Sequence, residues 1–154
     1  MDKDNEILLE LYKVYNGSTE NVSQKRQNTN SFFLSLNTGI IAILGFLLNK
    51  DTPSYLKYLY LLMPIVGILS GIFWLKLVIS YRQLNSGKYK TLSKIEEKLP
   101  FAPFSEEWEI LGKGNDHRKY HPLTNIEKGI PITFIAIFSS LFIYLLLVFL
   151  VVIK

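Results

Sequence analysis

The sequence predicts an all-α integral membrane protein with three transmembrane helices, an amphipathic N-terminal helix and a helical cytoplasmic loop. The main observation is that three long stretches carry no charged residue: Gln27 to Asn49, Tyr58 to Leu75 and Gly129 to Ile153. A hydrocarbon core about 30 Å thick needs roughly 20 mostly apolar residues in a helix. Only a helix satisfies its own backbone polar groups in lipid within one segment. We therefore expect each stretch to span the membrane.

These stretches set the expected organisation of the 154 residues. Neither of the two aqueous parts reaches the usual size of an independent domain, so we treat the chain as one membrane unit. Its expected parts are a cytoplasmic amphipathic helix at 1–27, spans at 28–49, 57–80 and 130–153, and a cytoplasmic helical loop at 81–128.

The placement of basic residues predicts the orientation. Nine basic residues lie between Arg82 and Lys128, and four precede the first span, whereas the short first loop contains only Lys50 and Lys57. Cytoplasmic loops carry an excess of Lys and Arg. We therefore expect the N-terminus and the long loop in the cytoplasm and Lys154 outside. Contact with anionic lipid headgroups accounts for the net charge of +4, and we expect no binding of nucleic acid.

The N-terminal segment has the apolar spacing of an amphipathic helix that lies on the membrane surface or against a partner helix. Its apolar residues are Ile7, Leu8, Leu11, Tyr12, Val14 and Tyr15. We expect Asn16-Gly17-Ser18 to interrupt this helix and Ser18 to cap a second helical stretch.

The first span begins with many polar side chains. Asn30 and Asn37 are seven residues apart and therefore share one side of a helix. One interpretation is a polar start of the helix at the headgroups. The interpretation that we favour is a packed helix contact, within the subunit or between subunits, in which an amide bonds a partner.

The second span contains Gly67-x-x-x-Gly71, a spacing that permits close helix packing. Lys76 follows near the inner end and Arg82 lies at the membrane exit. Both are candidates for headgroup contacts, with Lys76 extending toward the headgroups. The alternative is a ring of cations that lines a pore made by several copies.

Beyond Arg82 the second span is expected to continue as one helix to about Leu99. Leu84, Leu92, Ile95 and Leu99 form an apolar stripe that needs a partner. Lys90, Lys94 and Lys98 form a basic ridge, which we interpret as a solvated face. Pro100 then ends the helix.

The rest of the loop combines aromatic residues with helix signals. Phe101, Phe104 and Trp108 predict docking against an apolar surface, and Ser105 is the expected N-cap of a short helix. Thr124 and Glu127 have the spacing of a capping box. That box would start a short interfacial helix, with Pro131 restarting the membrane helix.

Residues that carry chemistry are few. The absence of cysteine excludes disulfides, thiolate metal sites and cysteine nucleophiles. His117 and His121 are four residues apart but lack a second ligand pair. No phosphate-binding loop or nucleophile elbow occurs. We expect no metal, no cofactor and no enzymatic activity.

Several segments together resemble a known family. They include Asn30-Ser31-Phe32-Phe33, Tyr81-Arg82-x-Leu84-Asn85 and Tyr120-x-Pro122-Leu123-Thr124. This pattern, from about residue 20 to residue 135, resembles the RipA-type small integral membrane proteins of bacteria, described as octameric. The resemblance implies a homo-oligomer, an octamer, of the bacterial inner membrane without a known catalytic activity.

Two functional hypotheses follow. The first is a non-enzymatic, ring-forming scaffold in envelope physiology, with Asn30, Asn37 and the stripe from Leu84 to Leu99 in packing contacts. The alternative is an oligomeric channel or membrane-permeabilising effector gated through the cytoplasmic loop, with Lys76 or Arg82 favouring anions.

Overall fold

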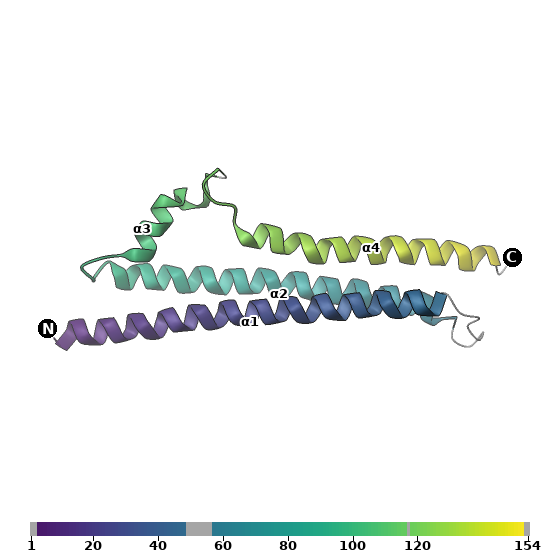
Figure 1. The fold of residues 1–154 in the computed structure, drawn as a ribbon, viewed down its shortest axis with the longest axis horizontal. Coiled ribbons are helices and arrows are strands. Elements are labelled where there is room, and N and C mark those ends of the chain that lie inside the picture. Colours follow the sequence, from purple (N-terminus) through teal and green to yellow (C-terminus); the bar gives the residue numbers. More distant parts are fainter. Residues whose placement is uncertain (1–2, 49–56, 117, 153–154) are drawn as a thin grey trace. The chain divides into compact units, whose positions relative to one another are not determined.

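The computed structural model describes residues 3–48, 57–116 and 118–152 (Figure 1). Its elements are helices α1 (Lys3–Leu48), α2 (Leu59–Glu96), α3 (Pro103–Ile110) and α4 (Leu123–Val152), with a short 3₁₀ helix, η2 (Gly112–Gly114), after α3. No strand occurs among the described residues. α1, α2 and α4 are long and apolar enough to cross a membrane. The predicted fold class is therefore confirmed.

By its contacts the chain divides into two compact units. The loop unit consists of Met1–Gln27 and Ile79–Ile126, and the span unit of Asn28–Val78 and Glu127–Lys154. Helices α1 and α2 each contribute one half to either unit. Lys50 of the short first loop, His117 and Lys154 lie outside the described residues. The exact span limits stay predictions.

α1 is one uninterrupted helix of 46 residues, so the predicted break at Asn16-Gly17-Ser18 was wrong. The polar side chains at this point bond within the helix. Thr19 Oγ1 donates to the Asn16 carbonyl at 2.7 Å, and Asn16 Nδ2 donates to Glu20 at 3.5 Å. A glycine in a helix costs only about 1 kcal/mol relative to alanine, and contacts along the helix outweigh that preference.

α2 confirms the predicted continuation of the second span, although it ends at Glu96 rather than Leu99. The amide of Leu99 closes a last turn on the Glu96 carbonyl at 2.9 Å, just before Pro100. α4 runs from Leu123 with Pro131 inside it. The separate short helix that was expected before Pro131 was therefore wrong.

α3 begins at Pro103, with Ala102 in the N-cap position and no side-chain cap. The predicted cap at Ser105 was wrong. Pro103 suits the first position of a helix because its missing N–H would have no partner there. The next amides are bonded by a carboxylate of α2, as described below, and Ser105 lies inside the helix.

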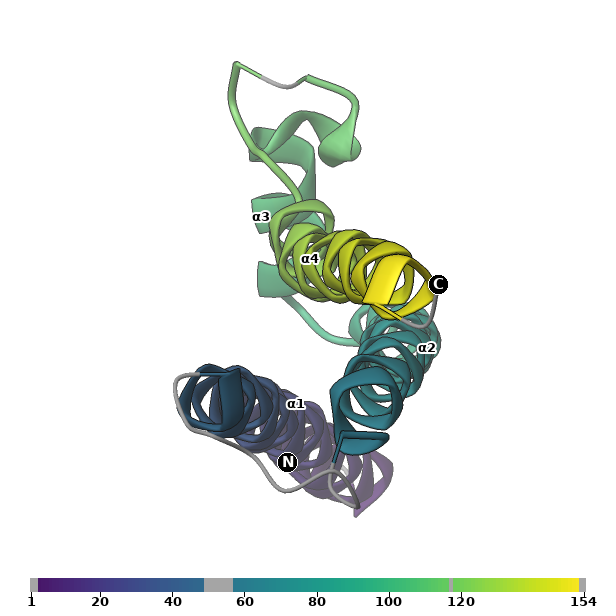
Figure 2. The ribbon, with the colours of Figure 1, turned by 90° about the vertical axis from the view of Figure 1, so that its right-hand side faces the viewer.

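The span unit is built from three helices, seen end-on in Figure 2. Ile40 and Leu44 of α1 form a buried cluster with Phe138 of α4, and Met63, Ile68, Phe134 and Leu141 pack around it. All three spans therefore meet at Phe138, which is fully buried.

Candidate functional site

Asn37 joins α1 to α2 inside the span unit. Its side chain is completely buried, and its Nδ2 donates to the Phe33 carbonyl at 2.7 Å and to the Ser70 hydroxyl at 3.1 Å. Among the described residues its Oδ1 atom is buried and accepts no hydrogen bond. An amide in this setting holds two helices in one register, because sliding them would leave its polar atoms without partners.

Asn30 joins all three spans. The Trp74 indole Nε1 donates to Asn30 Oδ1 at 2.8 Å, and Asn30 Nδ2 donates to Glu127 of α4 at 3.5 Å. The Trp74 ring is 1% exposed, stacks on Phe33 with centroids 5.9 Å apart and contacts Phe134 at 6.0 Å. No role was predicted for Trp74 from the sequence. The available signal was that a buried indole N–H needs an acceptor, for which an asparagine of the first span was a candidate.

Gly67 and Gly71 lie where α4 approaches α2. A Cβ atom added to Gly67 would be 2.6 Å from the Phe138 ring, and one added to Gly71 would be 2.6 Å from Ile135. Both contacts are shorter than two carbon atoms tolerate. The glycines are therefore required for the α2–α4 contact of one chain.

Glu96 is the polar centre of the loop unit. It is 1% exposed, and its carboxylate accepts hydrogen bonds from the Tyr12 hydroxyl at 2.9 Å, the Phe104 amide at 2.9 Å, and the Ser105 amide at 3.0 Å and hydroxyl at 2.8 Å. This single carboxylate fixes α1, the end of α2 and the start of α3. No role was predicted for Glu96 from the sequence.

The same hydrogen bonds determine the protonation states of Glu96 and Tyr12. Burial raises the pKa of Glu96, but the donors of Phe104, Ser105 and Tyr12 outweigh it, so the net pKa is lowered. Burial and the hydrogen bond to Glu96 raise the pKa of Tyr12 to about 12. At neutral pH an ionised glutamate therefore faces a neutral phenol.

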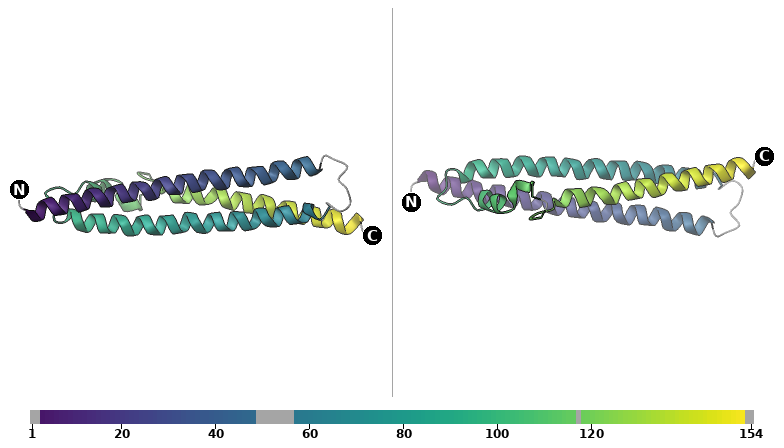
Figure 3. Two further views of the ribbon diagram at one scale, coloured as in Figure 1. Left: turned by 90° about the horizontal axis from the view of Figure 1, so that it is seen from below. Right: turned by 90° about the horizontal axis from the view of Figure 1, so that it is seen from above.

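Two further contacts fix the register of α1 and α2 in the loop unit, where both views of Figure 3 show them side by side. Asn85 Nδ2 donates to Ser23 at 3.4 Å, and Lys88 donates to Ser18. The Lys88 ammonium also lies 5.5 Å from the centre of the Tyr15 ring. Together with Tyr12 and Glu96, these pairs define an antiparallel packing.

The predicted stripe on α2 is distributed over different environments. Leu92 is fully buried and Ile95 is half-buried, whereas Leu84 is 49% exposed. Lys76 and Arg82 are both exposed in the single chain. The structure thus brings Leu92 and Ile95 into the chain's own packing and leaves Leu84, Lys76 and Arg82 on its surface.

The aromatic residues of the loop also separate into two groups. Phe104 contacts Tyr12 and Tyr89, with ring centroids 6.2 and 5.7 Å apart. Trp108 contacts Tyr120 at 6.4 Å but remains 47% exposed, and Phe101 is 64% exposed. Only Phe104 docks closely between helices of its own unit.

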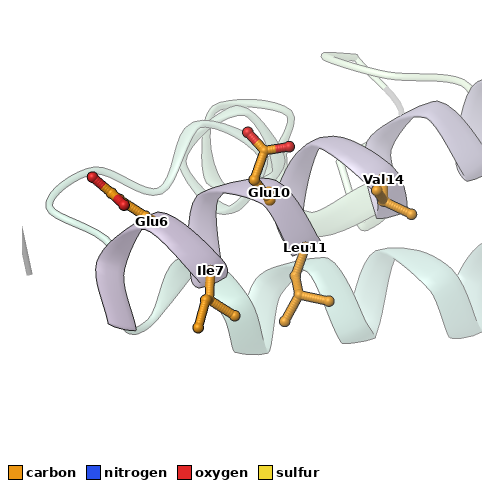
Figure 4. A pocket seen from close by; sticks show the side chains of 5 residues that line it. All are labelled: Glu6, Ile7, Glu10, Leu11 and Val14. Atoms are coloured by element: carbon orange, nitrogen blue, oxygen red, sulfur yellow. The ribbon is translucent and has the colours of Figure 1, made fainter. Parts of the chain in front are cut away.

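The N-terminal part of α1 presents an apolar stripe that no described part of the chain covers. Ile7, Leu11 and Val14 are 52, 50 and 67% exposed, whereas the adjoining Leu8, Tyr12 and Tyr15 are at least half-buried or turned toward α2. Figure 4 shows the stripe with the carboxylates of Glu6 and Glu10 along its edge. The hollow between these five side chains is lined by one helix alone, so it is an open helix face.

Comparison with known proteins finds a family for this chain. The family model described as the octameric membrane protein family (8xMP) matches residues 9–147. No curated protein matches the sequence, and no solved structure matches the chain.

Proposed function

The chain belongs to the octameric membrane protein family, whose name implies a homo-oligomer, and on this premise we propose that it is a non-enzymatic, ring-forming scaffold of the bacterial inner membrane. Each ring would contain eight copies and would organise the cytoplasmic face of the envelope through its loop units.

One observation carries this proposal: half-buried and fully buried polar groups join helices of the same chain, while the described part of the chain leaves the outer faces of the spans uncovered. Asn30, Asn37 and Glu96 are each bonded to a neighbouring helix. In the most apolar windows of α1, α2 and α4, only 17, 33 and 11% is buried within the chain. Such faces need lipid or other copies to cover them, as in an assembly of identical subunits.

The orientation belongs to this proposal. The excess of basic residues in 82–128 supports a cytoplasmic loop unit and an outer C-terminus. A protease site added after Lys154 should be cut in intact spheroplasts, whereas a site inserted in the 112–114 loop should be protected. The reverse pattern would overturn the orientation.

The test of the ring is the mass and projection shape of the full chain in nanodiscs. A discrete particle of eight copies supports the scaffold proposal. A monomer or dimer at all protein concentrations would overturn it, because neither can form a ring.

A second candidate function is a channel formed by the ring and gated through the cytoplasmic loop. It is favoured by the exposure of Lys76, a cation on a membrane-spanning helix, and of Arg82. If these residues line a conduit, Lys76→Gln and Arg82→Gln should lower the preference for anions in planar bilayers. Conductance that is unchanged by both substitutions would remove them from the lining.

A further inference from the structure

The Glu10 and Val14 edge of the exposed α1 stripe and a basic face of α2 lie on opposite outer sides of the loop unit. Tyr12 and Glu96 mark the sides on which the two helices face each other. Positions two residues apart on a helix differ by about 200°. Glu10 therefore lies on the side of α1 away from α2, and Lys94 on the side of α2 away from α1. Both are exposed.

The antiparallel register places these two outer sides at the same level. Three hydrogen-bonded pairs define this register: Tyr12 with Glu96, Ser18 with Lys88 and Ser23 with Asn85. From one pair to the next, the residue number increases on α1 and decreases on α2. Extending this register by two residues in either direction puts Val14 level with Lys94 and Glu10 level with Lys98. In a ring whose axis is normal to the membrane, every copy has the same height, so the levels match between neighbours as well.

The two sides are complementary in chemistry. Residues 3–14 of α1 contain three acids and two lysines, and Glu6 and Glu10 adjoin the exposed Ile7, Leu11 and Val14. The opposing side carries Lys90, Lys94 and Lys98, none of which forms an ion pair within the described part of the chain. Phe101, 64% exposed, follows Lys98 and supplies an apolar contact.

Lipid is a poorer occupant of the α1 stripe. Helices that lie on lipid carry Lys and Arg beside their apolar face, whereas Glu6 and Glu10 adjoin this stripe. The negative surface potential of a cytoplasmic leaflet attracts basic side chains rather than acidic ones. A second copy at the same level is therefore the better candidate to cover the stripe.

We propose that the Ile7-Leu11-Val14 stripe of one copy, with Glu6 and Glu10, packs against Lys94, Lys98 and Phe101 of the next copy. This inference rests on the proposed ring and names the surfaces that close it. The contact is heterologous, as a cyclic assembly requires, because each copy contributes its α1 side to one neighbour and its α2 side to the other.

Disulfide cross-linking tests this contact in a chain that contains no cysteine of its own. Val14→Cys and Lys94→Cys are introduced into separate, differently tagged full-length chains, which are coexpressed and oxidised in membranes. We expect a mixed dimer that carries both tags, and no dimer when either variant is expressed alone. A dimer of Val14→Cys with itself would indicate a two-fold contact and overturn the proposal.

The mass of the particle separates failure of the contact from failure of the ring. Eight-copy particles without the mixed dimer would overturn this interface and leave the ring intact. A cysteine at position 14 that a lipid-soluble maleimide labels in intact particles would assign the stripe to lipid instead. Particles smaller than a ring in the unmodified chain would overturn both proposals.

Charge reversal gives an independent measurement. Glu6→Lys with Glu10→Lys, or Lys94→Glu with Lys98→Glu, should raise the concentration at which the particle dissociates by about ten-fold, because each places like charges in contact. Combining all four substitutions should restore assembly. Reversing the Glu109–Lys113 pair of α3, which lies within one helix, is the matched control. Equal effects of control and test variants would contradict the contact.

Discussion

The Tyr12 hydroxyl donates a hydrogen bond of 2.9 Å to the carboxylate of Glu96, 84 residues further along the chain. This bond closes the loop unit. On the same carboxylate, the amides of Phe104 and Ser105 find the acceptor that no side chain of α3 provides. A single buried acid thus replaces an N-cap and fixes α1 against α2.

Glu96→Gln should reduce the free energy that holds α3 in the loop unit by about 1–3 kcal/mol. All four groups that face Glu96 donate in the structure, and an amide side chain has only one accepting atom. At least one donor would then face the N–H₂ group of the glutamine. Hydrogen exchange at the Phe104 and Ser105 amides should become faster. Glu97→Gln is the control, because Glu97 is exposed and its replacement should change stability by less than about 0.5 kcal/mol.

The Tyr12–Glu96 bond should make the stability of the loop unit depend on pH at both extremes. The pKa of Glu96 is lowered, so its contribution is present above the unfolded pKa of about 4.3 and is lost as the pH falls through the lower folded value. The pKa of Tyr12 is raised to about 12. Its contribution to stability is therefore fully present below the unfolded pKa of about 10 and is lost as the pH rises through the folded pKa of about 12.

The alkaline part of this prediction can be measured on one phenol. The ultraviolet difference between the unmodified chain and Tyr12→Phe isolates Tyr12 from the other tyrosines. Its titration should be centred near pH 12. A midpoint near 10, the value of a free phenol, would show that Tyr12 does not bond Glu96 in the membrane-bound protein.

The spans and the extension of α2 could be predicted because they depend on local composition. Uncharged runs predict the spans, and the apolar stripe predicts that α2 continues past Arg82. The role of Glu96 could not be predicted in this way, because it depends on a loop that folds back and places two amides on one carboxylate. The predicted break at Asn16-Gly17-Ser18 was wrong for a related reason, because hydrogen bonds along α1 outweigh a weak local preference for a break.

Periodicity also could not separate the members of one stripe. Leu84 and Leu92 have the same residue type and belong to one pattern, yet Leu92 is fully buried and Leu84 is 49% exposed. Which of them contacts the chain's own helices depends on where α1 and the loop pack. That information lies in contacts between residues far apart in sequence.

Asn37→Leu should weaken the packing of α1 on α2 by about 0.6–2 kcal/mol, because the amide bonds Ser70 across the two helices. A double-mutant cycle with Ser70→Ala, measured by unfolding in mixed detergent, should show a coupling of about 0.6 kcal/mol. Thr38→Val is the matched control, since the Thr38 hydroxyl bonds the Leu34 carbonyl of its own helix. Zero coupling between positions 37 and 70 would mean that the Asn37–Ser70 bond does not stabilise the chain.

Gly67→Ala should destabilise the span unit by about 1–3 kcal/mol. The new methyl group would lie 2.6 Å from three atoms of the Phe138 ring, which is fully buried and has little room to move. Unfolding in mixed detergent measures the loss. Gly39→Ala is the matched control within a span, because a Cβ at Gly39 meets nothing within 4 Å, and it should be neutral or stabilising.

The steric cause of the Gly67 effect can be tested by compensation. Phe138→Leu removes the ring and should cost about 1–3 kcal/mol alone, since it leaves space among Ile40, Leu44 and Phe134. In the double variant Gly67→Ala with Phe138→Leu, the added methyl group occupies part of that space. The double variant should therefore lose less stability than the two single changes added together. Strict additivity would show that Gly67 acts through its own backbone and not through close approach of α4.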